Sequence, residues 1–144
     1  MNVEIKEPKT AEEFEKYYEL RWRVLREPWG QPPGSEKDDL EGEATHIVAL
    51  IGGEIIGVGR IHFNSNIEAQ IRYMAVENHY REMGVGSMIL KRLEDVARVR
   101  GARRIVLNAR EEAVKFYRKH GYEVVGDAGT LFDSIRHWRM IKNL

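Results

Sequence analysis

The sequence contains a glycine-rich segment, Arg81-Glu82-Met83-Gly84-Val85-Gly86-Ser87, whose backbone amides could bind an anion. It follows an apolar stretch that ends at Val76 and precedes a helical pattern. The first amides of a helix have no partner inside the helix, and the helix dipole adds partial positive charge there. We expect Gly84 and Gly86 to allow positive φ angles and close approach of an anion, with Arg81 adding a guanidinium. The segment predicts a phosphate site, and a plain tight turn is the alternative.

Two better-known glycine motifs fit this segment poorly. A dinucleotide-binding fingerprint needs a third glycine where Ile89 stands. It also needs an acidic residue about twenty positions further on, where this chain has Arg103 and Arg104. A P-loop needs Gly-Lys-Ser/Thr, which the sequence lacks.

Length and composition exclude several classes of protein. The 144 residues favour a single domain spanning residues 1–144. Zero net charge argues against nucleic-acid and membrane partners. The chain has no cysteine, which excludes disulfides and thiolate chemistry and suits the cytoplasm. There is neither an apolar run of membrane-spanning length nor a signal-peptide core.

The charges are unevenly distributed along the chain. Residues 81–104 contain seven basic and three acidic residues, whereas residues 28–44 contain five acidic residues and one lysine. These segments could simply be solvated faces. Alternatively, an anionic ligand lies beside the first segment and a cationic ligand near the second.

The hydrophobic pattern predicts the elements that position the glycine segment. Predicted strands are Val3–Lys6, His46–Ile51, Glu54–Phe63, one ending at Val76, Arg104–Ala109, Tyr122–Val125 and Ser134–Lys142. Predicted helices run from the Thr10 capping box to Pro28, from the glycine segment to Gly101, and over Glu112–His120. Pro28–Ala44 and Gly126–Gly129 are predicted loops, the first of them long enough for binding or motion. The order indicates an α+β or α/β protein, with an antiparallel meander followed by a strand parallel to its neighbour.

Two blocks of sequence resemble the GCN5-related N-acetyltransferase (GNAT) family. Arg81–Gly86 is similar to its Arg/Gln-x-x-Gly-x-Gly/Ala signature, placed after a strand and before a helix. Asn108, Ala113, Phe116-Tyr117 and Gly121-Tyr122 resemble its second block. Arg21–Leu25, the acidic loop and His46-Ile47 resemble the small ElaA-like branch, which the Ser134–His137 segment matches only in part.

The resemblance implies the acyl-CoA N-acyltransferase fold, a three-layer arrangement with a mixed, mostly antiparallel sheet of about seven strands and about four helices. It implies acetyl-CoA as cosubstrate and transfer of an acetyl group to an amine. The cofactor-binding residues it implies are Met74, Ala75, Val76, Arg81, Glu82, Met83, Gly84, Val85, Gly86, Ser87, Asn108, Ala113, Phe116 and Tyr117. The diphosphate would bind the amides of the glycine segment, and the pantetheine arm would bind the backbone of Met74 and Val76 like an added strand.

Acetyl transfer makes chemical demands on these positions. The amine must be neutral to attack, so a general base helps. The amide of Met74 or Val76 could stabilise the oxyanion. Tyr117 stands where the family keeps a tyrosine that returns a proton to the leaving thiolate; alternatively it only packs on its helix. The base is open among His62, Glu68, Glu77, His79 and His137.

Three arginines on predicted strands or their ends, Arg60, Arg72 and Arg110, could recognise a carboxylate or phosphate on the substrate or form internal ion pairs. His46 is expected to pack or cap rather than bind a ligand. The five histidines lack metal-ligand spacing, so we expect no metal.

Three functions remain to be separated. The first is an acetyl-CoA-dependent N-acetyltransferase acting on a small-molecule or peptide amine, as a monomer or homodimer. The second is a catalytically silent acyl-CoA-binding sensor or interaction module, although the presence of Asn108 and Tyr117 favours the enzyme. The third, a nucleic-acid binder, is disfavoured by the zero net charge.

Overall fold

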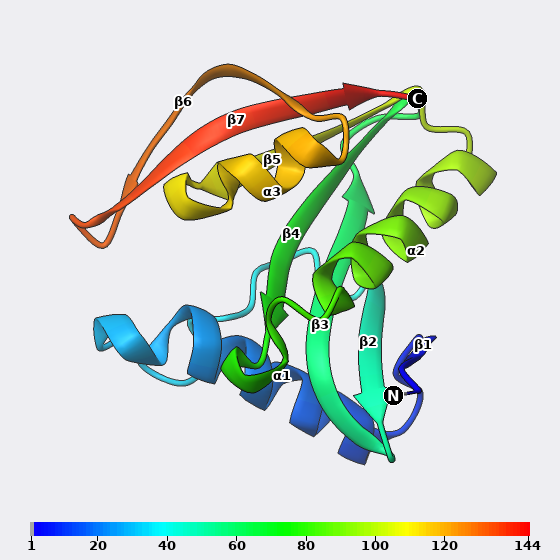
Figure 1. Ribbon diagram of the computed structural model, residues 1–144, viewed down its shortest axis with the longest axis vertical. Coiled ribbons are helices and arrows are strands. Elements are labelled where there is room, and N and C mark those ends of the chain that lie inside the picture. The colour runs from blue at the N-terminus through cyan, green and yellow to red at the C-terminus, as the bar shows by residue number, and fades with distance from the viewer. Residues whose placement is uncertain (1) are drawn as a thin grey trace.

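The computed structural model describes residues 2–144, which form one seven-stranded sheet flanked by helices (Figure 1). The elements in order are β1 (Glu4–Lys6), α1 (Ala11–Leu25), the 3₁₀ turn η1 (Glu27–Trp29), β2 (Thr45–Ile51), β3 (Glu54–Phe63), β4 (Glu68–Val76), the 3₁₀ turn η2 (Asn78–Tyr80), α2 (Val85–Val99), β5 (Arg104–Arg110), the 3₁₀ turn η3 (Glu111–Ala113), α3 (Val114–Lys119), β6 (Glu123–Leu131) and β7 (Ile135–Asn143).

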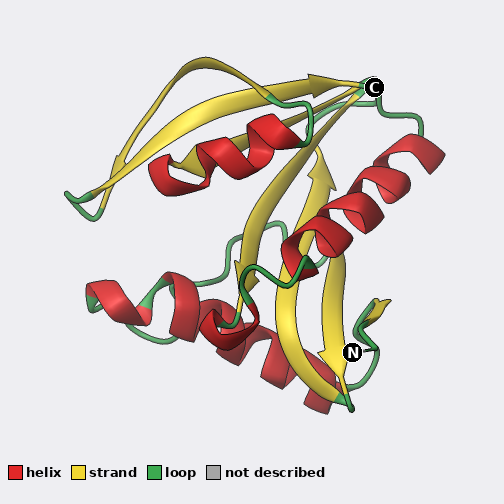
Figure 2. Ribbon diagram, viewed as in Figure 1, coloured by secondary structure: helices red, strands yellow, loops and turns green. Residues whose placement is uncertain are grey.

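The sheet is mixed and mostly antiparallel, as expected. Its strand order is β1-β2-β3-β4-β5-β7-β6, and the only parallel pair among residues 2–144 is β4 with β5. Within residues 2–144, three α-helices accompany the sheet (Figure 2), whereas the resemblance implies about four. The difference arises after α1, where Pro28, Pro32 and Pro33 allow only η1 and an irregular loop.

Two hydrophobic clusters hold the helices on opposite faces of the sheet. Tyr17, Leu20 and Leu25 of α1 pack on one face. Ile89 and Leu93 of α2 are both fully buried on the other face, where Tyr117 of α3 joins the same cluster. The three layers place the ends of α1 and α3 on either side of the middle of the sheet.

A β-bulge in β4 changes which face its side chains occupy. Val58 pairs with Ala75 and Arg60 pairs with Arg72, so Tyr73 and Met74 together lie opposite the single residue between them on β3. Tyr73 takes the extra turn at a φ of 58°. Ala69 and Ile71 therefore pack under α2, whereas Tyr73 and Ala75 pack under α1.

The last hairpin differs from the prediction. Gly126–Gly129 was expected to be a loop, but these residues lie within β6. Register shifts against β7 occur at Val124/Gly126 and at Asp127/Gly129, and Gly129 has a φ of 90°. The glycines mark bulges within a continuous strand and not its end. A glycine in a strand can indicate either feature.

The acidic loop between η1 and β2 is anchored to the sheet by buried ion pairs. Asp38 binds Arg60 and Arg72, and Glu41 binds Arg60 and Arg21. Arg21 and Arg60 are fully buried. Asp38 and Glu41, two of the five acidic residues of this loop, are thus paired with arginines of the protein itself, which weakens the argument for a cationic ligand there.

Candidate active site

A cleft opens in the middle of the sheet because the two parallel strands diverge. Pairing between β4 and β5 stops at Ile71 and Leu107, although β4 continues to Val76 and β5 to Arg110. Figure 1 shows the two strands meeting at one end and separating toward the other. Backbone groups on the facing edges of the two diverging segments are left without a strand partner.

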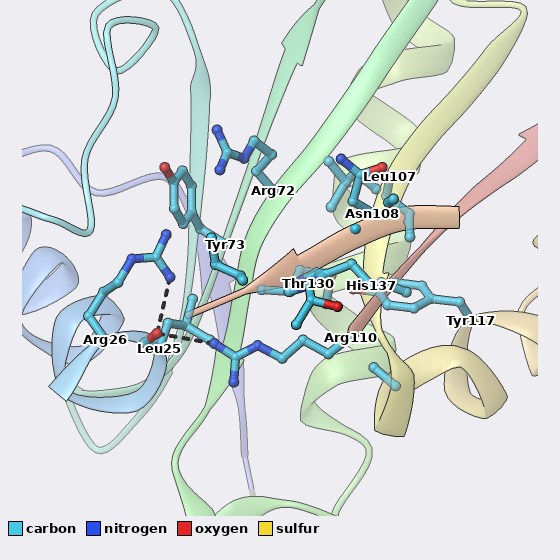
Figure 3. A pocket seen from close by; sticks show the side chains of 17 residues that line it. Leu25, Arg26, Arg72, Tyr73, Leu107, Asn108, Arg110, Tyr117, Thr130 and His137 are labelled. Carbon is cyan, nitrogen blue, oxygen red and sulfur yellow. Dashed lines mark hydrogen bonds between the residues drawn. The ribbon is translucent and has the colours of Figure 1, made fainter. Parts of the chain in front are cut away.

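A cavity of about 330 Å³ occupies this cleft. It is walled by the diverging strands, the ends of α1 and α3, and the β6–β7 hairpin. Figure 3 shows the side chains that line it. They are Leu25, Arg26, Ile71, Arg72, Tyr73, Met74, Leu107, Asn108, Ala109, Arg110, Ala113, Tyr117, Ala128, Gly129, Thr130, Leu131 and His137.

Tyr117 and Asn108 reach the cavity from different sides. Tyr117 is 8% exposed and belongs to the cluster under α2 and α3. Ala109 faces that same cluster, so alternation along β5 turns the exposed Asn108 side chain to the opposite face. The Tyr117 hydroxyl has no hydrogen-bond partner within residues 2–144, and burial raises its pKa above the usual value. It is therefore a neutral phenol with a free donor.

The glycine segment forms the start of α2 with its amides free. Gly84 is the N-cap residue at a φ of 78°, no side chain caps the helix, and Met88 donates the first helical hydrogen bond, to the Gly84 carbonyl. The amides of Val85, Gly86 and Ser87 have no protein acceptor in the described chain. Arg81, Glu82 and Met83 are exposed beside them. The chemistry of this donor set suits a phosphate.

The predicted role of Gly86 needs a correction. Gly86 is helical, and the non-glycine residue Glu82 instead has a positive φ, of 64°. A Cβ on Gly86 would lie 3.4 Å from the Phe116 ring. A side chain at position 86 would thus be in ordinary van der Waals contact with α3, and the positive φ angles of this segment belong to Glu82 and Gly84.

A further contact connects the start of α2 to the C-cap residue of α3. The Ser87 hydroxyl and His120 Nε2 are 2.9 Å apart. Phe116 and Ala113 pack against the main cluster, and Ala113 also lines the cavity. The cavity itself ends at Ala113 and Tyr117 and does not include the glycine segment.

The backbone of β4 presents donors to the cleft. The Glu77 amide donates to Ile56 on β3 at 2.8 Å. Because successive amides of a strand point to opposite edges, those of Val76 and Met74 face the edge that β5 has left. These are the two amides that the sequence suggested for an oxyanion.

Of the five candidates for the base, only His137 lines the cavity. His62 is held between Arg60 and Asn64, Glu68 pairs with Arg104, and Glu77 pairs with Arg23. His79 is exposed on η2, outside the cleft.

His137 has the geometry of a neutral base. Its Nδ1 lies 2.9 Å from the Ile135 carbonyl and must donate to it, which leaves the lone pair on Nε2. Burial lowers the pKa of His137 below 6.5, and the charges of Arg110 and Arg26 lower it further. The imidazole is therefore uncharged at neutral pH.

The three arginines named from the sequence lie in different environments. Arg60 is buried in the ion-pair network and does not reach the cavity. Arg72 lines the cavity and pairs with Asp38 at 2.8 Å. Arg110 lines the cavity without forming an ion pair with any described residue.

Sequence reasoning missed Arg26, Tyr73 and the hairpin residues Ala128–Leu131. Arg26 follows the last residue of α1, and Tyr73 lies within 6 Å of four guanidinium groups, the nearest being that of Arg21 at 4.2 Å. The abundance of arginine in Arg21–Arg26 was a signal for such a cluster. The hairpin residues gave no signal, because their segment was read as a loop.

Comparisons with known proteins agree with this architecture. The family model described as "Acetyltransferase (GNAT) family" matches residues 14–122. The Bacillus subtilis protein YjcF, an uncharacterised N-acetyltransferase, is 35% identical over 135 residues, which cover 94% of this chain and 96% of that protein. The crystal structure of Escherichia coli ElaA is similar with a TM-score of 0.81 at 17% identity, covering 99% of both chains. A GNAT family acetyltransferase from Elizabethkingia anophelis, solved with acetyl-CoA bound, has a TM-score of 0.77 at 17% identity, also covering 99% of both chains. No helix within residues 2–144 is long and apolar enough to cross a membrane.

Proposed function

This chain belongs to the GNAT family of acetyltransferases, and we propose that it transfers an acetyl group from acetyl-CoA to a primary amine. The observation that carries the proposal is the cleft between β4 and β5, with Tyr117 inside it and the uncapped start of α2 beside it. The similar acetyltransferase from Elizabethkingia anophelis binds acetyl-CoA, which supports the same cosubstrate here.

The residues present fit acetyl-CoA. The free amides of Val85, Gly86 and Ser87 match a diphosphate, and the exposed Arg81 adds positive charge. The open edge of β4 can bind an extended arm by backbone hydrogen bonds, with Met74 and Val76 as donors. Asn108 and Ala113 line the cavity, and the Phe116 ring lies beside Gly86 of the glycine segment.

Bound acetyl-CoA would supply a thioester carbonyl that a neutral amine attacks, with the C–N bond forming and the C–S bond breaking. The Met74 and Val76 amides, which face the open edge of β4, would stabilise negative charge on the carbonyl oxygen. His137 Nε2 can accept the proton that the amine loses. The Tyr117 hydroxyl can donate to the departing sulfur.

The raised pKa of Tyr117 bears on how it would act. A phenol whose pKa is above 10 transfers its proton unfavourably to a thiolate whose own pKa is near 8.5. Tyr117 therefore contributes a hydrogen bond to the sulfur, and the proton from the bulk reaches the thiolate after release. The benefit is stabilisation of developing negative charge.

A thiol-release assay over a panel of amines tests the proposal. Release of free CoA that depends on both acetyl-CoA and an amine is the expected result. Tight binding of acetyl-CoA by calorimetry with no release over the panel would instead identify a catalytically silent sensor. Absence of binding would reject the site itself.

A further inference from the structure

The wall of the cavity is positively charged. Three arginines line it, Arg26, Arg72 and Arg110, and no aspartate or glutamate is among the lining residues. An ammonium ion entering this cavity would meet like charge and no carboxylate. The lining side chains thus carry positive charge, whereas a site for a simple cationic amine would need negative charge.

Two of the three guanidinium groups lack an acidic partner. Arg72 is compensated by Asp38. Within residues 2–144, no carboxylate oxygen lies within 4.0 Å of a guanidinium nitrogen of Arg26 or Arg110. Glu112 is the acidic residue whose charge acts on Arg110, and it forms no ion pair with it.

Both groups instead donate to the same oxygen atom. Arg26 Nη1 and Arg110 Nη2 approach the Leu25 carbonyl at 3.0 and 3.1 Å (Figure 3). This carbonyl ends α1, where the helix dipole is negative. Arg26 reaches it from the end of α1 and Arg110 from the end of β5, so two elements far apart in sequence bring their charges together.

The pair retains donors that the protein does not use. A guanidinium has five N–H groups. Within the described chain, the Arg110 side chain donates one hydrogen bond, to the Leu25 carbonyl. The Arg26 side chain donates two, to the Leu25 and Ser35 carbonyls. The Arg110 group also stacks on the Trp29 ring at 4.5 Å, which fixes its plane.

Like charges held together with only dipoles for compensation are unfavourable until an anion binds. Arg26 is 7% exposed and Arg110 is half-buried. Burial lowers the pKa of both guanidinium groups, and neighbouring arginines lower each further. An oxyanion in the cavity would relieve this cost and use the free N–H groups in a bidentate manner.

Building on the proposed acetyl transfer, we propose that the acceptor amine carries an acidic group, a carboxylate or a phosphate, that Arg26 and Arg110 bind. The amine would then lie deeper, toward His137 and the open edge of β4. Arg26 and Arg110 are specificity-determining residues in this arrangement. Their positive field also favours the neutral form of the amine, which is the form that attacks.

Matched pairs of amines separate the acidic group from the rest of the acceptor. The carboxylate arm compares glycine, leucine, phenylalanine and glutamate with their primary α-amides, and the phosphate arm compares phosphoethanolamine with ethanolamine. An amino-acid amide has the less basic amine and therefore the larger neutral fraction. A preference for the acid thus runs against intrinsic reactivity and must come from the binding site.

We expect at least one acid to exceed its neutral partner in kcat/KM by 10-fold or more. The Arg110→Gln variant should lower kcat/KM for that acid by about 10-fold to 100-fold, mainly through KM, since a hydrogen bond to a charged group is lost. The ratio of kcat/KM for that acid to kcat/KM for its neutral partner should fall by about the same factor, because any effect of the lost charge on His137 is common to both substrates. Arg110→Lys should retain part of the preference for the acid. Arg92→Gln, on the exposed side of α2, should leave kcat/KM unchanged for both substrates.

Failure of this inference is distinguishable from failure of the proposed function. If neutral amines react as well as or better than every acid, the acidic acceptor is rejected and acetyl transfer stands. If no amine reacts, calorimetry with the N-acetyl derivatives of the four amino acids and their amides decides. Binding of an acid that Arg110→Gln abolishes would support the inference without catalysis, and absence of any preference for the acids would overturn it.

Discussion

Asp38 binds the fully buried guanidinium of Arg60 with both carboxylate oxygens, at 2.6 and 3.0 Å. The same carboxylate accepts a hydrogen bond from Arg72 at 2.8 Å. Hydrogen bonds from Arg60 and the charges of Arg60 and Arg72 hold the pKa of Asp38 well below its usual range, although burial alone would raise it. One loop residue thus fixes a strand residue in the core and another in the cavity wall.

Replacing Asp38 by asparagine should destabilise the fold by about 3 kcal/mol, because it removes one of the two carboxylates that compensate a buried guanidinium and turns an amide donor toward it. Urea denaturation at pH 7 measures the loss. Asp39→Asn is the matched control, since Asp39 is exposed and makes no ion pair with any described residue. Equal stability of the two variants would show that Arg60 is compensated by Glu41 alone.

Replacing Gly84 by valine should weaken acetyl-CoA binding at least 10-fold by calorimetry. Gly84 has a φ of 78° in open surroundings, so a β-branched residue would shift the backbone that presents the amides of α2. Gly101→Val imposes similar strain, at a φ of 91°, beyond the other end of the same helix. It should lower stability without changing affinity. Unchanged binding in Gly84→Val would reject this loop as the phosphate site.

Replacing Tyr117 by phenylalanine should lower kcat by about 10-fold to 100-fold and leave acetyl-CoA affinity within about 2-fold, because only a donor to the departing sulfur is lost. The matched control is Tyr122→Phe. Tyr122 donates to Glu94 at 2.9 Å, so its loss should reduce stability by about 1–3 kcal/mol with kcat unchanged. A Tyr117→Phe enzyme with full kcat would remove this hydroxyl from the mechanism.

The pH dependence of kcat tests His137. A base acts in its neutral form, and the pKa of His137 is lowered below 6.5, so its protonation should add an acid limb to kcat below about pH 6.5, separate from the effect of protonating the acceptor amine at higher pH. His137→Gln should lower kcat at pH 7.5 by about 100-fold and abolish this acid limb. His79→Gln, on the exposed turn η2, should retain both. Persistence of the limb in His137→Gln would assign it to another group.

The elements of this fold were predictable where local patterns were complete. The Thr10 capping box is present, with Glu13 returning the hydrogen bond, and α1 begins directly after it. The strand Glu54–Phe63 was predicted to the residue, and Gly101 ends α2 at a φ of 91° as expected. In each case a few neighbouring residues determine the geometry.

Prediction was less successful where the structure depends on pairing across the sheet. The Gly126–Gly129 segment resembles a loop in isolation, and only its register with β7 makes it a strand. The bulge at Tyr73 contains no glycine that would have predicted it, and it depends on the pairing of β3 with β4. Such features arise from contacts that sequence spacing does not report.

The candidate site divides in the same way. The glycine segment and Tyr117 each lie in a short block of sequence, so the element that carries each of them could be predicted. The wall of the cavity could be predicted only in part, because Arg110 was named from the sequence whereas Arg26 and Thr130, which come from two other elements, were not. The partners of the polar residues were equally hidden, so His62 and His137 looked equivalent until one proved to be enclosed and the other to line the cavity.

The bulge in β4 implies that the opening of the cleft depends on the one extra residue that β4 has relative to β3. Without Tyr73, the alternation that sends Ala69 and Ile71 under α2 would continue along the strand. The second half of β4 could then stay paired with β5, and the cleft between the two strands would not form. A chain shortened by one residue at this point would be expected to fold into a sealed sheet with no entrance for a long, thin molecule.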